Sequence, residues 1–104
     1  MKSEVKLLKK AKELLVSLPA ASRTKAVKIL ELLEEKGTYL AAPYVKNISG
    51  KLWELRAGQT RLFYFLSEGV FVVVSGFVKK TQKTPKNEID KALGEIKKYL
   101  EGSG

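Results

Sequence analysis

The sequence contains no cysteine and no histidine, and these two absences exclude several kinds of active site. Without cysteine there is no disulfide and no thiolate metal site. Without histidine the chain lacks the side chain that most often acts as acid, base or zinc ligand near neutral pH. Catalytic sets that combine serine or cysteine with histidine are therefore excluded as well.

Long apolar runs and phosphate-binding motifs are also missing. The longest apolar run, residues 70–74, is far shorter than a membrane span. Charged residues recur as far as Lys12, so no signal-peptide core follows the start, and we expect a cytoplasmic protein. There is no Walker loop or GxGxxG motif, and the carboxylates form no metal-ligand pattern. The sequence therefore predicts neither a metal nor a cofactor.

Acidic residues are scarce relative to basic ones. The 104 residues carry 20 lysines and arginines against 11 acids, a net charge of +9. This balance favours a nucleic acid, an anionic membrane surface or an acidic protein as partner. Within residues 76–86 no acid interrupts a run of lysines, namely Lys79, Lys80, Lys83 and Lys86. A solvated loop explains such a run as well as a polyanion site does.

The length and the mixture of residues predict one globular domain over residues 1–101 and a flexible tail over residues 102–104. Apolar residues at helical spacing predict a helix over residues 3–17, which Pro19 ends. A short strand over residues 4–8 is the weaker alternative. A second helix is expected over residues 22–36, with Ser22 as its N-cap. Together the two helices form a helical hairpin.

The pattern changes after this hairpin. Residues 39–50 contain proline, asparagine and glycine, and are expected to form a loop with a little extended structure. Alternating and aromatic segments separated by glycine-containing turns then predict three strands of an antiparallel meander, over residues 52–56, 60–66 and 70–78.

A last helix is expected to begin at Thr84 and Pro85, with Thr84 as cap, and to run to about Tyr99. Its expected buried face comprises Ile89, Ala92, Leu93, Ile96 and Leu100. The predicted fold class is therefore α+β: an N-terminal helical hairpin packed on a small antiparallel β-meander, with a C-terminal helix.

Two arginines stand on either side of the first turn of the meander. Arg56 ends one strand and Arg61 lies near the start of the next, so a hairpin brings them together. Beside lysines on a following loop, two arginines on strands make a preorganised phosphate clamp. Ordinary pairing with Glu54 or Glu68 is the alternative reading. The lysines that complete the expected clamp are Lys79, Lys80 and Lys83.

Aromatic residues interleave with these cations in the meander, and such faces can stack unpaired RNA bases. Strand aromatics more often belong to the core. If Phe63 and Phe65 face the core, however, Tyr64 points to the other side of the sheet, where its hydroxyl reaches the site or the solvent. The interleaved aromatics are Trp53, Phe63, Tyr64, Phe65, Phe71 and Phe77.

Several motifs together resemble the phage-derived Gp49-like branch of the HigB toxins, within the RelE/ParE superfamily. They are LWELR at residues 52–56, TRLFYF at residues 60–65 and GFVKKTQKTP at residues 76–85, followed by Glu88, Ile89 and Ala92. The helical hairpin over residues 14–33 is similar more loosely. The start departs from the family pattern, because members usually begin with a strand that joins the sheet.

The resemblance implies a RelE-like fold and an mRNA interferase that cleaves messenger RNA in the ribosomal A site. It also implies a helix-turn-helix antitoxin, encoded next to the toxin, as partner. Arg56 falls where RelE-like toxins carry a catalytic lysine or arginine, and Arg61 matches their strand-borne arginine. Glu54 departs, since relatives often have a basic residue there.

The expected mechanism is metal-independent: the 2′-hydroxyl attacks the neighbouring phosphate, giving a 2′,3′-cyclic phosphate and a 5′-hydroxyl. Arg61 is expected to stabilise the phosphate and Arg56 to orient it or support the acid. Without histidine a lysine serves as base, because neighbouring cations lower a lysine's pKa, and the candidates are Lys80 and Lys83. Expected RNA contacts are Lys51, Trp53, Tyr64, Lys79, Thr81 and Lys86.

Three other functions remain open from the sequence. A ParE-like gyrase poison would cleave no RNA and would cause DNA damage. A non-catalytic RNA-binding domain would bind RNA in a salt-sensitive manner. An inactive toxin homologue would retain only its protein partner.

Overall fold

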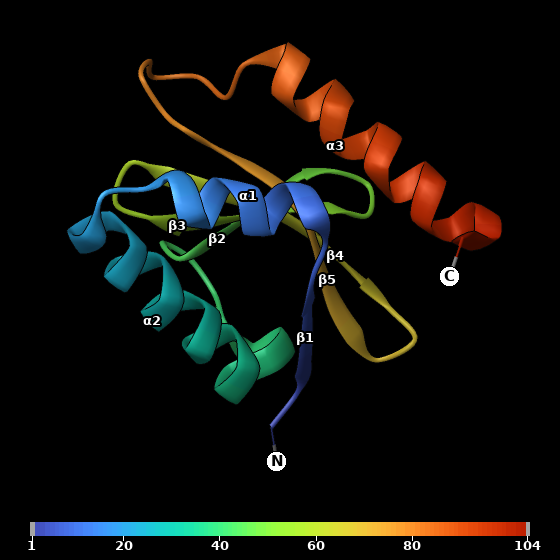
Figure 1. Ribbon diagram of the computed structural model, residues 1–104. Helices are drawn as coiled ribbons and strands as arrows, with labels where there is room; N and C mark the ends of the chain where they lie inside the picture. Colours follow the sequence, from blue (N-terminus) through green and yellow to red (C-terminus); the bar gives the residue numbers. More distant parts are fainter. Residues whose placement is uncertain (1, 104) are drawn as a thin grey trace.

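Five strands form one mixed sheet within residues 2–103, the part of the chain that the computed structural model describes (Figure 1). Across the sheet the order is β1-β5-β4-β3-β2. β1 runs parallel to β5, and the other neighbouring pairs are antiparallel. The α+β class is thus confirmed, with a larger sheet than expected. The strands are β1 (Glu4–Leu7), β2 (Val45–Ser49), β3 (Leu52–Ala57), β4 (Thr60–Ser67) and β5 (Val70–Val78).

The N-terminal segment corrects the prediction of one helix over residues 3–17. β1 comes first, and helix α1 (Lys9–Ser17) begins only after Leu8. Val5 and Leu7 alternate with exposed residues in β1, and this two-residue period matches a strand beside β5. The weaker alternative from the sequence is therefore the one observed, and it supplies the family's N-terminal strand.

The helical hairpin is confirmed, with a different start for its second helix. Helix α2 (Ala20–Lys36) follows Pro19 directly, and Ser22 lies inside the helix instead of capping it. Arg23 fastens the hairpin, because its guanidinium donates to the carbonyl oxygens at the end of α1 and in the connection. Those acceptors are Leu15, Val16 and Leu18, at 3.0, 3.0 and 2.8 Å.

The expected loop over residues 39–50 contains ordered structure. It follows the short 3-10 helix η1 (Gly37–Tyr39) into β2, which pairs with β3 at the edge of the sheet. The side-chain amide of Asn47 closes the turn between β2 and β3, because its Nδ2 donates to the carbonyl oxygens of Gly50 and Leu52 at 3.0 and 3.3 Å. An edge strand with mostly exposed polar residues gives little hydrophobic alternation, so the sequence pattern missed it.

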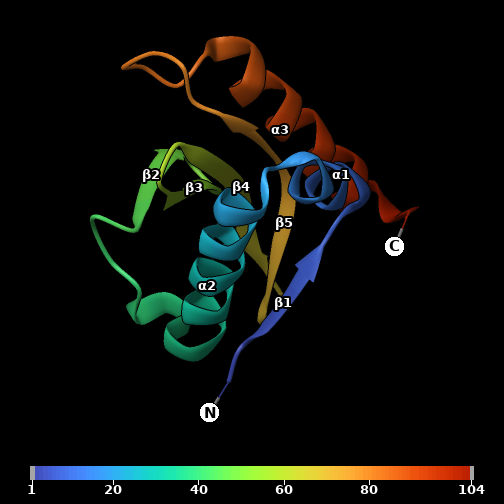
Figure 2. The same ribbon diagram turned by 60° about the vertical axis from the view of Figure 1, so that its left-hand side comes forward.

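Helices cover both faces of the sheet, as the rotated view makes clear (Figure 2). α1 packs on β5 and α2 on β3, on one face, while α3 (Lys86–Lys98) crosses the other face over β5. The helical-hairpin face buries Leu15, Leu33, Leu55, Leu62 and Val73, among others. The α3 face buries Leu52, Phe63, Phe65, Val72, Val74, Phe77, Ala92 and Ile96.

The last helix ends at Lys98, close to the expected Tyr99, but differs from its prediction at its start and in its buried face. Pro85 stands at the N-cap position, and Thr84 makes no cap but turns its side chain to the sheet. Leu93 and Leu100, expected in the buried face, are 41% and 50% exposed. A π-helical turn, η2 (Tyr99–Ser103), includes part of the expected flexible tail, and Gly104 lies outside the described residues.

Gly76 lets α1 lie close to the sheet. A Cβ atom at this position would lie 2.5 Å from Leu14 Cδ2, 2.6 Å from the Arg61 carbonyl oxygen and 2.8 Å from Leu62 Cδ2. These separations are too short for real atoms, so only glycine fits without a shift of the helix or the strand. Gly76 therefore sets the distance between α1 and the middle of the sheet.

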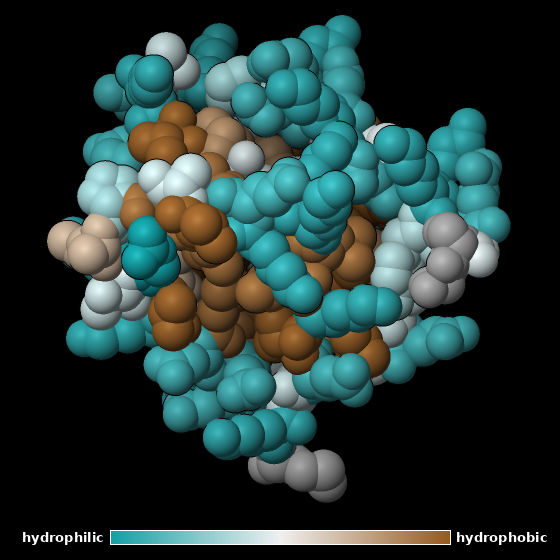
Figure 3. Space-filling view, in the orientation of Figure 1, coloured by the Kyte–Doolittle hydropathy of each residue, from teal (hydrophilic) through white to brown (hydrophobic). Residues whose placement is uncertain are grey.

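Hydrophobic residues on the side of α1 and α2 gather between these helices and β1, with hydrophilic residues around them (Figure 3). Two apolar side chains on these helices are exposed to solvent, Val16 at 74% and Val27 at 43%. Among the described residues no helix is both long and apolar enough to span a membrane.

Candidate functional site

Two rows of side chains, which run across the sheet on the α3 side, bring the charged residues of the meander together. In one row Lys46, Glu54, Phe63 and Ser75 lie opposite one another, and in the next Arg56 and Arg61 lie opposite Phe77. Side chains in neighbouring rows of one face lie close enough for long residues to touch. The register therefore gathers a carboxylate and three cations on one part of the sheet.

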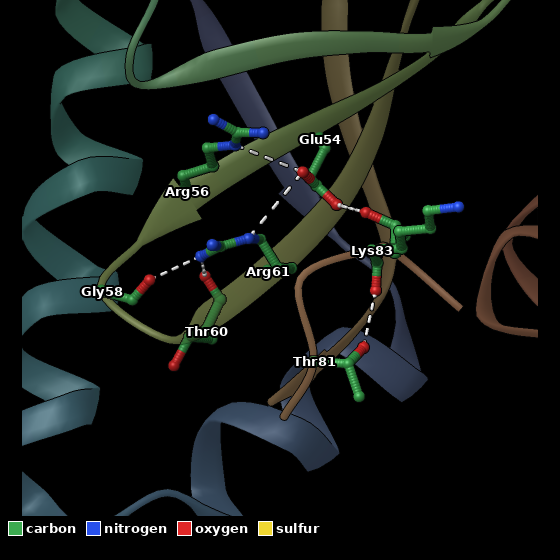
Figure 4. A network of polar contacts seen from close by, with 8 residues as sticks. Glu54, Arg56, Gly58, Thr60, Arg61, Thr81 and Lys83 are labelled. Carbon is green, nitrogen blue, oxygen red and sulfur yellow. Dashed lines mark hydrogen bonds and ion pairs between the residues drawn. The ribbon is translucent and has the colours of Figure 1, made fainter. Parts of the chain in front are cut away.

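Glu54 is the centre of this group, and its side chain is fully buried (Figure 4). Its Oε1 accepts from Arg56 Nε at 3.3 Å and lies 3.8 Å from Arg61 Nε. Its Oε2 accepts from the Thr84 hydroxyl at 2.8 Å. A buried carboxylate needs such partners, because an unpaired charge away from water is costly. Glu54 does pair with the arginines, as the alternative to a clamp expected, but the carboxylate is buried in the sheet and the pairing is not a surface one.

Arg61 is held inside this network. Its side chain is only 11% exposed, and its Nη1 donates to the carbonyl oxygens of Gly58 and Thr60 at 2.5 and 3.2 Å. Burial lowers the pKa of the Arg61 guanidinium, an effect that Glu54 opposes and Arg56 reinforces. The guanidinium stays charged at any ordinary pH. Both of these hydrogen bonds come from Nη1 and fasten the β3–β4 turn, whereas the buried Nε makes no hydrogen bond and meets Glu54 only as an ion pair at 3.8 Å.

Arg56 lies at the open side of the same carboxylate. Its side chain is 34% exposed, and only its Nε is engaged, so its two terminal nitrogens have no partner among the described residues. It lines a groove of about 310 Å³ together with three lysines, Lys46, Lys79 and Lys83. We call this feature the cation groove. Polar and apolar side chains complete its wall: Asn47, Ile48, Gln82, Thr84 and Ile89.

Hydrogen bonds hold the segment between β5 and α3 at both ends, and they fix the positions of its lysines. The amide of Lys79 donates to the Gln59 carbonyl in the β3–β4 turn at 2.7 Å. The Thr81 hydroxyl donates to the Lys83 carbonyl at 2.9 Å, which closes the bend. The Thr84 hydroxyl reaches Glu54. The ammonium groups of Lys79 and Lys83 make no hydrogen bond or ion pair among the described residues, so they are open to an anion.

The family described as "Phage derived protein Gp49-like (DUF891)" matches residues 13–97 of the chain. The chain belongs to this family. The resemblance drawn from the LWELR and GFVKKTQKTP motifs is therefore confirmed. No curated protein matches the chain by sequence.

Solved structures similar to this Gp49-like protein include RelE toxins. The archaeal RelE–RelB complex from Pyrococcus horikoshii OT3 has TM-score 0.66 and 22% identity, covering 76% of this chain and 97% of that chain. The toxin–antitoxin complex RelBE2 from Mycobacterium tuberculosis has TM-score 0.62 and 16% identity, covering 76% and 100%. A free mutant of Escherichia coli RelE has TM-score 0.58 and 20% identity, covering 96% and 99%. The Gp49-like chain therefore has the RelE fold.

The residues expected at the site are divided among several places of the Gp49-like fold. Arg56, Lys79 and Lys83 lie together in the cation groove. Lys80 and Thr81 line a neighbouring hollow with Phe77 and Pro85. Two further expected RNA contacts are exposed: Lys51, in the β2–β3 turn, and Lys86, the first residue of α3.

Trp53 and Tyr64 lie on the opposite face of the sheet. Both line a hollow of about 200 Å³ near η1, and Tyr64 is only 5% exposed. Burial raises the pKa of the Tyr64 hydroxyl to about 12. As expected, Tyr64 points away from Phe63 and Phe65, but that side of the sheet holds the second core instead of the site.

Lys46 is the groove cation that sequence reasoning missed. It lies on β2, in a segment expected to be a loop, and the strand register places it opposite Glu54. The only sign of this strand in the sequence is that Val45 and Ile48 are apolar, as residues of a short edge strand can be. Within residues 2–103 no three acidic side chains gather as metal ligands do, and metal independence stays a prediction.

Proposed function

We propose that this chain is the toxin of a toxin–antitoxin pair, and that it cleaves messenger RNA on the ribosome without a metal. The observation that carries the proposal is the cation groove, in which Lys46, Arg56, Lys79 and Lys83 face one space beside the sheet. Clustered cations suit a phosphodiester, whose charge grows as the reaction passes through a phosphorane. The RelE fold supports the same activity.

The proposed reaction uses the 2′-hydroxyl of the RNA as nucleophile. A base removes its proton, the 2′-oxygen attacks the adjacent phosphorus, and the 5′-oxygen leaves and takes up a proton. The products are a 2′,3′-cyclic phosphate and a 5′-hydroxyl. No metal or cofactor is needed for this balance, because the nucleophile, the leaving group and both protons belong to the substrate and the protein.

The roles that we propose for the groove residues differ from those expected from the sequence. The two terminal nitrogens of Arg56 make no hydrogen bond among the described residues, and Arg56 is the residue proposed to hold the phosphate. Arg61 supports it from the buried side. Of the two lysines expected as base, Lys83 lines the groove and Lys80 lines the neighbouring hollow, so Lys83 is the proposed base. Lys46 and Lys79 add positive charge around the phosphate.

The proposed protein partner is a helix-turn-helix antitoxin with an acidic segment. A groove lined by four cations and a net charge of +9 attract such a segment, and its binding would keep RNA out. The structures named as RelE–RelB and RelBE2 complexes show that proteins of this fold pair with antitoxins. Messenger RNA and the ribosome are the other proposed partners.

The test compares cleavage of messenger RNA on translating ribosomes, in the presence of a chelator, by the wild type, Lys83→Arg and Lys80→Arg. Arginine keeps the charge but does not give up its proton, so Lys83→Arg removes a base alone. We expect wild-type cleavage with cyclic-phosphate ends, a loss of about 10²–10⁴-fold in Lys83→Arg, and little change in Lys80→Arg. Gyrase-dependent DNA breaks, or RNA binding without any cleavage, would overturn the proposal.

A further inference from the structure

We propose that Glu54 is the positioning residue of the cation groove, which aims Arg56 at the phosphate and fixes the lysine-bearing loop relative to it. This inference rests on the proposed function, because it names what orients the groove for cleavage. Glu54 itself is fully buried and reaches no substrate. It acts through three contacts, to Arg56, Arg61 and Thr84.

The strand register places two like charges next to each other, and Glu54 pairs with both. Arg56 and Arg61 lie directly opposite each other on β3 and β4. Like charges in that arrangement repel and would turn the two side chains apart. Glu54 lies one row away on the same face, 3.3 Å from Arg56 Nε and 3.8 Å from Arg61 Nε. One carboxylate oxygen therefore holds both guanidiniums on the same side.

The nitrogen of Arg56 that binds Glu54 determines which of its N–H groups remain for a phosphate. Glu54 engages Nε, the inner nitrogen, and leaves the two terminal nitrogens on the outer edge of the guanidinium (Figure 4). Two parallel N–H groups on that edge match two oxygens of a phosphate. A carboxylate that bound the terminal nitrogens would instead block the fork. The contact to Nε thus orients Arg56 without occupying it.

The second carboxylate oxygen links this arginine to the loop. Thr84 donates to Glu54 Oε2 at 2.8 Å, across thirty positions of sequence. Thr84 follows Lys83 directly, and both line the groove. Because one carboxylate holds Arg56 and Thr84 at once, it sets the separation between the strand arginine and the loop lysine. Small errors in such a separation are costly for catalysis.

Electrostatics alone would argue against a carboxylate at this position. Glu54 removes positive charge beside a groove that is proposed to bind a polyanion, so replacing it by a neutral residue should strengthen RNA binding. Positioning predicts the opposite effect on the reaction rate. The two explanations are therefore separable, since one concerns affinity and the other concerns the rate of the bound complex.

The experiment uses Glu54→Gln, with Glu68→Gln as matched control, because Glu68 is exposed in the β4–β5 turn and its replacement makes the same change in charge. Affinity is measured with an RNA that carries a 2′-deoxy nucleotide at the cleavage point, and the rate with the cleavable RNA at saturation. We expect Glu54→Gln to bind equally or up to a few-fold more tightly and to cleave at least tenfold more slowly. Glu68→Gln should keep the wild-type rate.

A second variant covers the case in which Glu54→Gln fails to fold. Thr84→Val removes only the loop contact, and we expect slower cleavage with affinity within about twofold of the wild type. The Nε–H resonances of Arg56 and Arg61 report the arginine contacts directly, and should move in Glu54→Gln but not in Thr84→Val. Unchanged cleavage in both variants, or equal losses of affinity and rate, would overturn the positioning role.

The resonances also keep this inference distinct from the proposed function. If the wild type cleaves no RNA, the proposed function fails, whatever the arginine signals show. If the wild type cleaves RNA but Arg56 Nε–H is the same in Glu54→Gln as in the wild type, the proposed function stands and Glu54 is not what holds Arg56.

Discussion

Arg56 and Arg61 face each other on neighbouring strands, yet their replacement should have different consequences. Arg61→Ala removes a mostly buried guanidinium that donates to two turn carbonyls and lies beside Glu54. Loss of hydrogen bonds from a charged group costs about 1.5–3 kcal/mol. Glu54 keeps Arg56 and Thr84 as partners, so the cost stays below the roughly 3–5 kcal/mol of a fully unpaired buried charge.

The corresponding thermal shift is large enough to measure. For a domain of this size, 1 kcal/mol changes Tm by about 4–8 °C, so a loss of about 2 kcal/mol lowers the Tm of Arg61→Ala by about 8–16 °C. Arg56→Ala removes one contact of a side chain that is one-third exposed, which is worth at most about 1 kcal/mol. Its Tm should therefore fall by no more than about 4–8 °C, less than that of Arg61→Ala.

Cleavage should follow the reverse order. Removing one preorganised donor from a site of developing charge lowers the rate by about 10²–10³-fold, and Arg56→Ala removes the donors that face the groove. Thermal unfolding followed by circular dichroism, together with single-turnover cleavage well below the Tm of both variants, checks the two effects. A stable but inactive Arg61→Ala beside an active Arg56→Ala would refute the reasoning and restore Arg61 as the phosphate ligand.

Three further predictions concern packing, pH and salt. Gly76→Ala should lower the free energy of unfolding by about 1–3 kcal/mol, because its Cβ would overlap Leu14. Gly94→Ala in α3, which has open space around it, should instead raise the free energy of unfolding by about 0.5–1 kcal/mol. Denaturant titrations check both values. Burial raises the pKa of Tyr64 from 10.0 to about 12, so the stability it contributes is present below pH 10 and is lost as the pH rises through 12. Tyr64→Phe should lose less stability over that window, and an equal loss would contradict the burial of the phenol. RNA affinity should fall as the salt concentration rises, and Lys46→Met should make the log–log slope shallower by at most about 0.7; an unchanged slope would remove Lys46 from the site.

The sequence was sufficient for the fold class and for the parts of the site that local patterns encode. The helical hairpin and the three meander strands follow from periodicity and turn residues, and the strand arginines follow from their places beside the turn. The lysine run after β5 also marks two groove residues, Lys79 and Lys83. Each of these features depends on residues that are close in the sequence.

Features that depend on tertiary contacts were not predictable in this way. β1 is a strand because β5 offers it a parallel partner, and four residues of alternation were enough to suggest a strand only as the weaker alternative to a helix. Lys46 joins the groove only through the pairing of β2 with β3. Thr84 has the sequence of a helix cap, but a buried carboxylate thirty positions away is its actual partner. Arg61 pairs with that same carboxylate and is buried, so it does not line the cation groove.

The measurement that tests the account most directly is the location of bound RNA on the protein. An RNA with a 2′-deoxy nucleotide at the cleavage point is titrated into the labelled protein, and backbone and side-chain resonances are followed by NMR. The account predicts saturable shifts at Lys46, Arg56, Lys79 and Lys83, with Trp53 and Tyr64 unaffected on the other face. Shifts that centre on Trp53 and Tyr64 and leave the cation groove unchanged would contradict it.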